Sequence, residues 1–292
     1  MNAAGNAGNW DSMAAALTLA LVRVSAMLAL APFFTARSIP ARTKAIFSLA
    51  VCVLLVPTVA AAAVKDGGVE LSFQGLLGEL AVGVIYGLTL SLLNEMLLLA
   101  GQIVGLQFSF SLVNLLDPAS EIQTPLMGDL FQLMGTWVLI SAGLDRVMLA
   151  SMVRSIRAVP LGSFPLAAVP TTAHVLVPLI SGSFFAALEL AAPVLAATVM
   201  VEISVALLGK LSPQLPVISL TVPLKTLTGF VLLIGSLALW PRFIEARFSS
   251  LLDVAERLIS DGVHEGVHPG TPAGMPQLVT PVAMPVGVRG GG

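Results

Sequence analysis

One short pattern near the C-terminal end has the residue types and spacing of a metal site. The sequence HEGVH at residues 264–268 matches the zinc-protease pattern, in which two histidines one helical turn apart bind zinc and the glutamate acts as general base. The flanking Gly262, Pro269 and Gly270 oppose a helix, and no Asp, Glu or His follows His268 to serve as a third ligand. We therefore expect no metal site here.

Other patterns associated with catalysis are incomplete. The Gly-Lys pair at residues 209–210 resembles the end of a phosphate-binding loop, but Ser204 stands where that loop requires its first glycine. Leu211 also replaces the Ser or Thr that should follow the lysine. His174 has no metal-ligand or nucleophile partner near it in the sequence. We expect a non-enzymatic protein that needs no cofactor, nucleotide or metal.

Six charged residues interrupt otherwise apolar segments. Each would cost about 2.5–3.5 kcal/mol at the centre of a helix inserted in a bilayer. They must therefore pair within the protein, contact other subunits or line a water-filled pathway, and the sequence assigns no pairs. The six residues are Arg23, Glu79, Glu95, Glu189, Glu202 and Lys225.

A loop-like segment breaks the most apolar part of the chain. Residues 105–120, GLQFSFSLVNLLDPAS, pass from an apolar helix into a stretch of apolar and hydroxyl side chains. In a membrane such a break is tolerated only where protein encloses it or where it borders an aqueous path. Pro118 disfavours helix at Asp117 and ends the helical course. From the residues alone, this is either a functional segment or a buried turn.

Composition identifies the broad class of protein. Hydrophobic residues make up 57% and charged residues 10%, whereas ordinary soluble domains have roughly 45–50% and about 25%. The chain is therefore predicted to be a membrane-embedded or membrane-assembled protein. A net charge of −2 argues against nucleic-acid binding. Cys52, the single cysteine, lies in an apolar run and cannot form an intrachain disulfide.

The apolar stretches are long enough to be helices, so we predict an all-α fold. The fifth stretch would be about 50 Å long at ~1.5 Å per residue, against a hydrocarbon layer of about 30 Å. It is either a hairpin hinged near Pro193 or one tall helix. A flexible N-terminus (1–12), one membrane domain (13–260) and a disordered Pro/Gly-rich tail (261–292) are expected. The predicted helices are 13–34, 45–64, 76–101, 126–144, 174–208 and 222–240.

Two further patterns concern how these helices are arranged. Glycines four residues apart at 83 and 87 and at 101 and 105 would let neighbouring helices approach closely, although such pairs are common by chance. Basic loops prefer the cytoplasmic side of a membrane, so the basic loop 37–44 is expected there. If each predicted helix then crosses the bilayer in turn, the three arginines of residues 146–157 lie outside, which the same preference opposes. Some segment is therefore expected not to cross the bilayer simply.

Several separated motifs together resemble the FliR family, membrane proteins of the flagellar export gate that are homologous to the T component of virulence injectisomes. The motifs are APFF (31–34), RSIPARTK (37–44), GLQ (105–107), DPAS (117–120), SPQL (212–215) and VPLK (222–225). Their order and spacing agree with the family over residues 17–259. The motif residues expected to be structurally important are Pro32, Arg37, Pro40, Gly105, Gln107, Pro213, Gln214 and Pro223.

The resemblance implies a specific architecture and set of partners. FliR-like proteins are built from bent helical hairpins and join several FliP-like and FliQ-like subunits in a helical hetero-oligomer at the inner membrane of the flagellar basal body. FlhB-like and FlhA-like proteins and membrane lipid are further expected contacts, and unfolded polypeptides are the expected substrates. The broken segment then corresponds to the family's pore plug, formed by Phe108, Ser109, Phe110, Leu112, Val113, Leu115, Leu116, Asp117 and Pro118.

Three other functions remain open at this level. Lys225 resembles injectisome members more than some flagellar ones, whereas the loop 37–44 favours a flagellar protein. A secondary transporter would use the intramembrane glutamates to bind a proton or solute, but the chain shows no repeat with matching broken helices. A purely structural scaffold is the last alternative.

Overall fold

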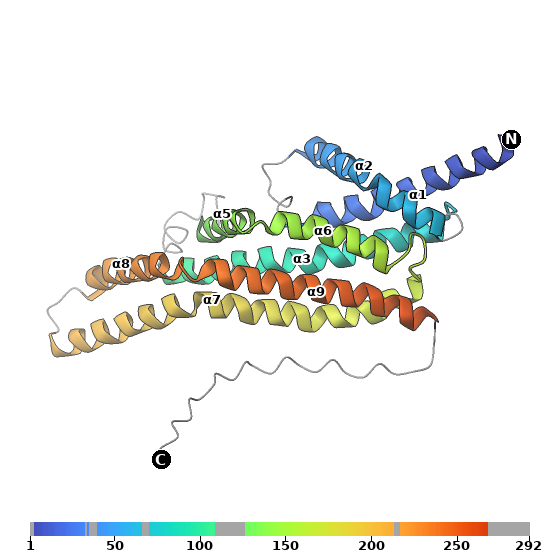
Figure 1. The fold of residues 1–292 in the computed structure, drawn as a ribbon. Helices are drawn as coiled ribbons and strands as arrows, with labels where there is room; N and C mark the ends of the chain where they lie inside the picture. The colour runs from blue at the N-terminus through green and yellow to red at the C-terminus, as the bar shows by residue number, and fades with distance from the viewer. Residues whose placement is uncertain are drawn as a thin grey trace, which may run out of the picture.

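A computed structural model shows an all-helical chain. It describes residues 3–32, 34, 40–65, 70–108, 126–212 and 217–267, and these contain no β-strand, which confirms the predicted all-α fold. Figure 1 shows long helices lying side by side. They are α1 (Ala3–Leu30), α2 (Ala41–Lys65), α3 (Phe73–Gln107), α5 (Leu126–Ser141), α6 (Leu144–Ala158), the short 3-10 helix η1 (Leu166–Ala168), α7 (Val169–Leu211), α8 (Val217–Ser236) and α9 (Trp240–Val267).

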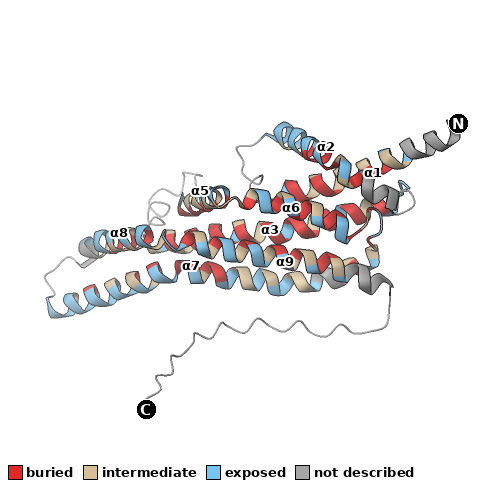
Figure 2. Ribbon diagram, in the orientation of Figure 1, coloured by how far each residue is buried: buried red, intermediate tan, exposed pale blue. Residues whose placement is uncertain are grey.

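Helix α3 lies at the centre of the bundle and packs against α1, α5, α7 and α9. Figure 2 shows buried residues, in red, along the length of this helix. The hydroxyl of Ser72 begins the helix by accepting a hydrogen bond from the Gly75 N–H at 2.9 Å. A Cβ atom at Gly83 would lie 2.6 Å from the Arg23 carbonyl oxygen of α1. The glycine therefore allows the α1 and α3 backbones to pack closely, as its spacing predicted.

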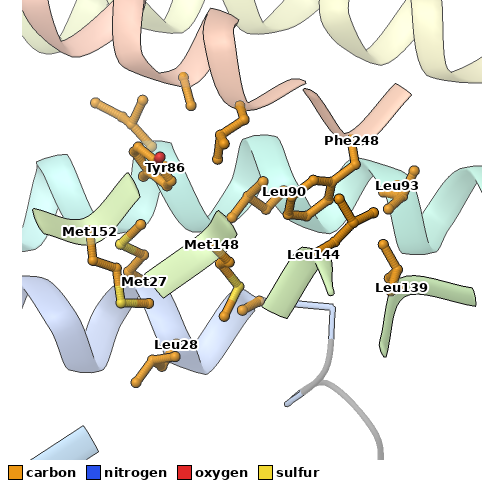
Figure 3. Close-up of a cluster of buried hydrophobic side chains, with 14 of the residues drawn as sticks. Met27, Leu28, Tyr86, Leu90, Leu93, Leu139, Leu144, Met148, Met152 and Phe248 are labelled. Atoms are coloured by element: carbon orange, nitrogen blue, oxygen red, sulfur yellow. The ribbon is translucent and has the colours of Figure 1, made fainter. Parts of the chain in front are cut away.

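A large apolar core joins α3 to the helices around it. Figure 3 shows part of this core, in which Met27 of α1 and Met152 of α6 lie near Tyr86 of α3, and Phe248 of α9 lies between Leu90 and Leu93. Trp240, at the start of α9, is buried against Phe131 of α5 with ring centroids 4.7 Å apart. Tight packing of this kind fixes the helices relative to one another.

Two helix pairs are sharply bent, and each joins an apolar helix to a more polar one. The α5–α6 pair bends by 73° and the α8–α9 pair by 64°. The sequence predicted α5 and α8 as apolar stretches but did not predict α6 or α9. The arginines of residues 146–157 lie on α6, so they do not end a straight apolar crossing. Within the described residues, only α1, α2, α3 and α7 are unbent helices long and apolar enough to cross a membrane.

Helix α7 is one continuous helix that runs through Pro178 and Pro193. Of the two interpretations of the fifth apolar stretch, the structure therefore shows the tall helix, and α8 packs beside it. At ~1.5 Å per residue its 43 residues extend about 65 Å.

The helices at both ends of the chain are longer than the apolar stretches. Helix α1 begins at Ala3, inside the segment 1–12, and α9 continues to Val267. The expectation that glycines near His264 prevent a helix is therefore wrong up to Val267, since an interior glycine costs only about 1 kcal/mol relative to alanine. His268 lies outside the described residues, among which no group of three His, Cys, Asp or Glu could hold a metal.

Candidate functional site

The segment that follows α3 leaves and rejoins the bundle at one place. Helix α3 ends beside Phe108, and the chain is next described at Leu126, where α5 begins. The first turn of α5 packs directly on the last turns of α3, because a Cβ at Gly101 would lie 2.4 Å from the Met127 carbonyl oxygen. Met127 also lies against Gly105, 3.2 Å from the position of an added Cβ. The two ends of residues 109–125 are therefore anchored side by side.

Phe108 is fixed by helix α8. Its side chain is buried, and its ring stacks on Phe230 with centroids 4.8 Å apart and an interplanar angle of 24°. Gly229 provides the space for this ring, because a Cβ there would lie 2.0 Å from Phe108 Cε1. The Phe108 N–H donates to the Val104 carbonyl at 3.2 Å and continues the helical hydrogen bonding. Helix α8 thus holds Phe108, the last described residue before 109–125.

Of the predicted plug residues, the structure describes Phe108 alone. The other members lie outside the described residues: Ser109, Phe110, Leu112, Val113, Leu115, Leu116, Asp117 and Pro118. The sequence did not single out Gly229, Phe230 or Met127. A glycine inside an apolar helix gives no distinctive pattern, as shown by Gly235 of the same helix, which has no atom within 4 Å of an added Cβ.

This difference between two glycines of α8 gives a matched test. We expect Gly229→Ala to destabilise the protein by about 1–3 kcal/mol, because the new methyl group must push the Phe108 ring from its place. Gly235→Ala should instead stabilise α8 by about 1 kcal/mol through helix propensity. Unfolding midpoints in detergent would measure both changes, and equal shifts in the two variants would contradict the proposed packing.

A buried ion pair near the start of α3 ties three helices together. Arg23 of α1 binds both carboxylate oxygens of Glu79 of α3, through Nε and through Nη2, the latter at 2.9 Å from Oε1. Arg23 Nη1 donates to the Ser155 and Val159 carbonyls at the end of α6, both at 3.0 Å. Oε1 of Glu79 also accepts the Gly162 N–H at 2.8 Å. The two side chains are 1% and 0% exposed, so nearly every hydrogen-bonding group is satisfied without water.

Three of the other intramembrane charges are also paired inside the chain. Lys225 of α8 contacts Glu202 of α7, and Glu189 of α7 accepts from Arg247 of α9 at 3.3 Å. Glu95 of α3 is exposed and has no ion-pair partner among the described residues. The alternative of pairing within the bundle therefore holds for five of the six predicted residues in the described structure.

The family-motif residues fall at helix ends and in helix contacts. Pro32 is buried after α1, and the Pro40 carbonyl accepts the Thr43 N–H at 3.0 Å at the start of α2. Gln107 is the last residue of α3, next to the Gly105–Met127 contact, and Pro223 lies exposed inside α8. Three motif residues lie outside the described residues: Arg37, Pro213 and Gln214.

Comparison with known proteins gives consistent matches along most of the chain. Residues 14–251 match the family described as bacterial export proteins, family 1. The chain is similar to the flagellar biosynthetic protein FliR of Bacillus subtilis, with 24% identity over 249 residues that cover 84% of this chain and 95% of the relative. FliR of Escherichia coli is 25% identical, with coverages of 82% and 91%. FliR of Caulobacter vibrioides is 28% identical, with coverages of 81% and 94%.

The family match includes α2 to α8 in full, most of α1 and the first part of α9, so it contains residues 109–125 and the buried ion pair. Within the described residues the apolar helices agree with a membrane protein of this kind. The chain belongs to family 1 of the bacterial export proteins, as a membrane protein of the FliR family.

Proposed function

We propose that this chain is a core subunit of a flagellar type III export gate. In this proposal it assembles with FliP-like and FliQ-like subunits in the inner membrane at the basal body, next to FlhB-like and FlhA-like proteins. The assembly forms the pore through which unfolded flagellar proteins leave the cytoplasm. Family membership supports this proposal, and the reported relatives are named as flagellar proteins.

The observation that carries the proposal is the closed base of residues 109–125. The contact of Met127 with Gly101 and the stacking of Phe108 on Phe230 fix both ends of the segment on the bundle. Because the residues on both sides are fixed, a passing polypeptide can displace residues 109–125 without unfolding of α3 or α5. The apolar residues of this segment would exclude water and ions from a pore at rest, as hydrophobic constrictions do in channels.

The outer surface of the chain also supports an assembly with both apolar and aqueous surroundings. Helices α2, α7 and α8 expose many large apolar side chains, which require lipid or apolar protein surfaces. Helix α9 exposes charged side chains, including Arg242, Glu245 and Asp253, which require water or polar partners. A subunit of a membrane pore has both kinds of neighbour.

Replacing residues 109–120 by a Gly-Ser linker of equal length tests the proposal. The chain would be co-expressed with the FliP-like and FliQ-like proteins of its own organism, and the complex would be placed in proteoliposomes. We expect the complex to form but to conduct ions, because the apolar plug is gone while the base of the loop is retained. The same replacement at residues 66–69, between α2 and α3, is the control and should leave the pore closed.

Three other results would contradict parts of the proposal. Absence of any complex between the unmodified chain and these partners would exclude the pore subunit. A normal complex without leakage would indicate a structural scaffold. Loss of the uptake of a small solute, with no effect on the partners, would indicate a secondary transporter.

A further inference from the structure

Helix α3 has one side that the other described residues leave open along most of its length. We call this side the α3 stripe. Its eight residues follow one another along the sequence at repeating intervals of four, four and three positions. Such a spacing repeats every 11 residues in three turns, so the stripe follows the helix axis almost directly. Leu80, Leu88, Glu95, Gln102 and Leu106 are exposed, and Val84, Ser91 and Leu99 between them are half-buried.

The α3 stripe is set apart from the contacts inside the chain. Helices α1 and α5 approach α3 at Gly83, Gly87 and Gly101, which lie on another side of the helix. From residue 80 to residue 106 the stripe extends about 40 Å at ~1.5 Å per residue, which exceeds the roughly 30 Å of a hydrocarbon layer. The central helix of the described bundle thus presents a partly exposed surface long enough for a whole transmembrane helix.

Glu95 lies near the middle of the α3 stripe. The other intramembrane carboxylates each face a cation from another helix, but Glu95 has no such partner within the described residues. Contact with lipid would cost it about 2.5–3.5 kcal/mol. An aqueous surface does not fit either, because five of the eight stripe residues are Leu or Val. The pattern fits an apolar protein surface with one opposite charge.

We propose that the α3 stripe is the docking surface for an apolar helix of a neighbouring export-gate subunit, and that this helix places a Lys or Arg opposite Glu95. The inference rests on the proposed assembly and adds the chemistry of one contact within it. The chain itself contains an example of such a contact between two helices, because Lys225 of apolar α8 meets Glu202 of apolar α7. Helix pairing would bury the apolar side chains and neutralise the carboxylate together.

Charge reversal at Glu95 tests this contact in the co-expressed complex with FliP-like and FliQ-like proteins. We expect E95K to lower the recovery of the complex by at least about tenfold, because two like charges in an interface cost several kcal/mol. Replacing the facing Lys or Arg of the partner by Glu should restore recovery with E95K. E245K, the same reversal at an exposed carboxylate of α9, is the matched control and should assemble like the unmodified chain.

Crosslinking identifies what covers the α3 stripe. Photoreactive residues at positions 88, 95 and 106 should link to one and the same helix of one partner. Crosslinks to lipid alone would overturn the inference. Reaction of E95C, in a C52S background, with a membrane-impermeant maleimide in the intact complex would also overturn it.

The charge-reversal experiment separates this inference from the proposed function. If E95K assembles as well as E245K in a normal complex, the inference alone is overturned. Failure of the unmodified chain to assemble would overturn the proposed function as well.

Discussion

Replacing Arg23 by alanine should destabilise the folded protein by roughly 3–5 kcal/mol, since removal of one partner of a buried ion pair leaves the other charge uncompensated. The carboxylate of Glu79 would remain 0% exposed, with the Gly162 N–H as its one remaining partner. The Val159 carbonyl at the end of α6 would also lose its donor, and the Ser155 carbonyl would keep the Val159 N–H but lose Arg23. We expect a large fall in the unfolding midpoint in detergent and in the yield of folded protein.

Two control variants separate this effect from a general effect of lost charge. Arg154 pairs with Glu256 at 2.8 Å but is 53% exposed, so Arg154→Ala should cost no more than about 1 kcal/mol. The double substitution Arg23→Met with Glu79→Leu removes both buried charges and should recover part of the stability. Recovery will be incomplete, because the Gly162 N–H and the Val159 carbonyl both lose the partners that the ion pair provides. A midpoint of R23A equal to that of R154A would show that the ion pair is unimportant for folding.

The sequence predicted the apolar helices well because their length alone distinguishes them. Helices α6 and α9 were missed because their many charges hide them from a search for apolar runs. A helical period could have revealed α6, since its buried residues Leu144, Met148, Met152 and Ser155 recur every three or four positions. The bend before α6 is marked by Gly143, whose φ of 71° is rare for other residues.

The pairing of the charges could not be predicted in the same way. Arg23 and Glu79 are separated by 56 positions in the chain, and their contact depends on where α1 crosses α3. One local signal existed, because Gly83 lies one turn after Glu79 and allows α1 to approach there. The candidate site shows the same limit. Phe108 was predicted from its motif, but its partners Gly229 and Phe230 come from a distant helix.

Gly101→Val should have the second large effect, because it separates α3 and α5, the two helices that flank residues 109–125. A Cβ at Gly101 would lie 2.4 Å from the Met127 carbonyl oxygen and 2.7 Å from Gly128 Cα. These are backbone atoms, so the clash cannot be relieved by rotation of a side chain, and α5 itself must move. We expect a destabilisation at or above the upper end of the roughly 1–3 kcal/mol that is typical of overpacking.

The consequence for function follows from the position of this contact. If α5 moves away from α3, the two ends of residues 109–125 are no longer held together, and the proposed plug loses its fixed base. G101V complexes that still assemble should therefore leak ions in proteoliposomes even though the plug sequence is intact. Gly182→Val in α7, where an added Cβ meets no atom within 4 Å, is the matched control and should neither destabilise nor leak. A tight pore in an assembled G101V complex would mean that the base of the loop does not control closure.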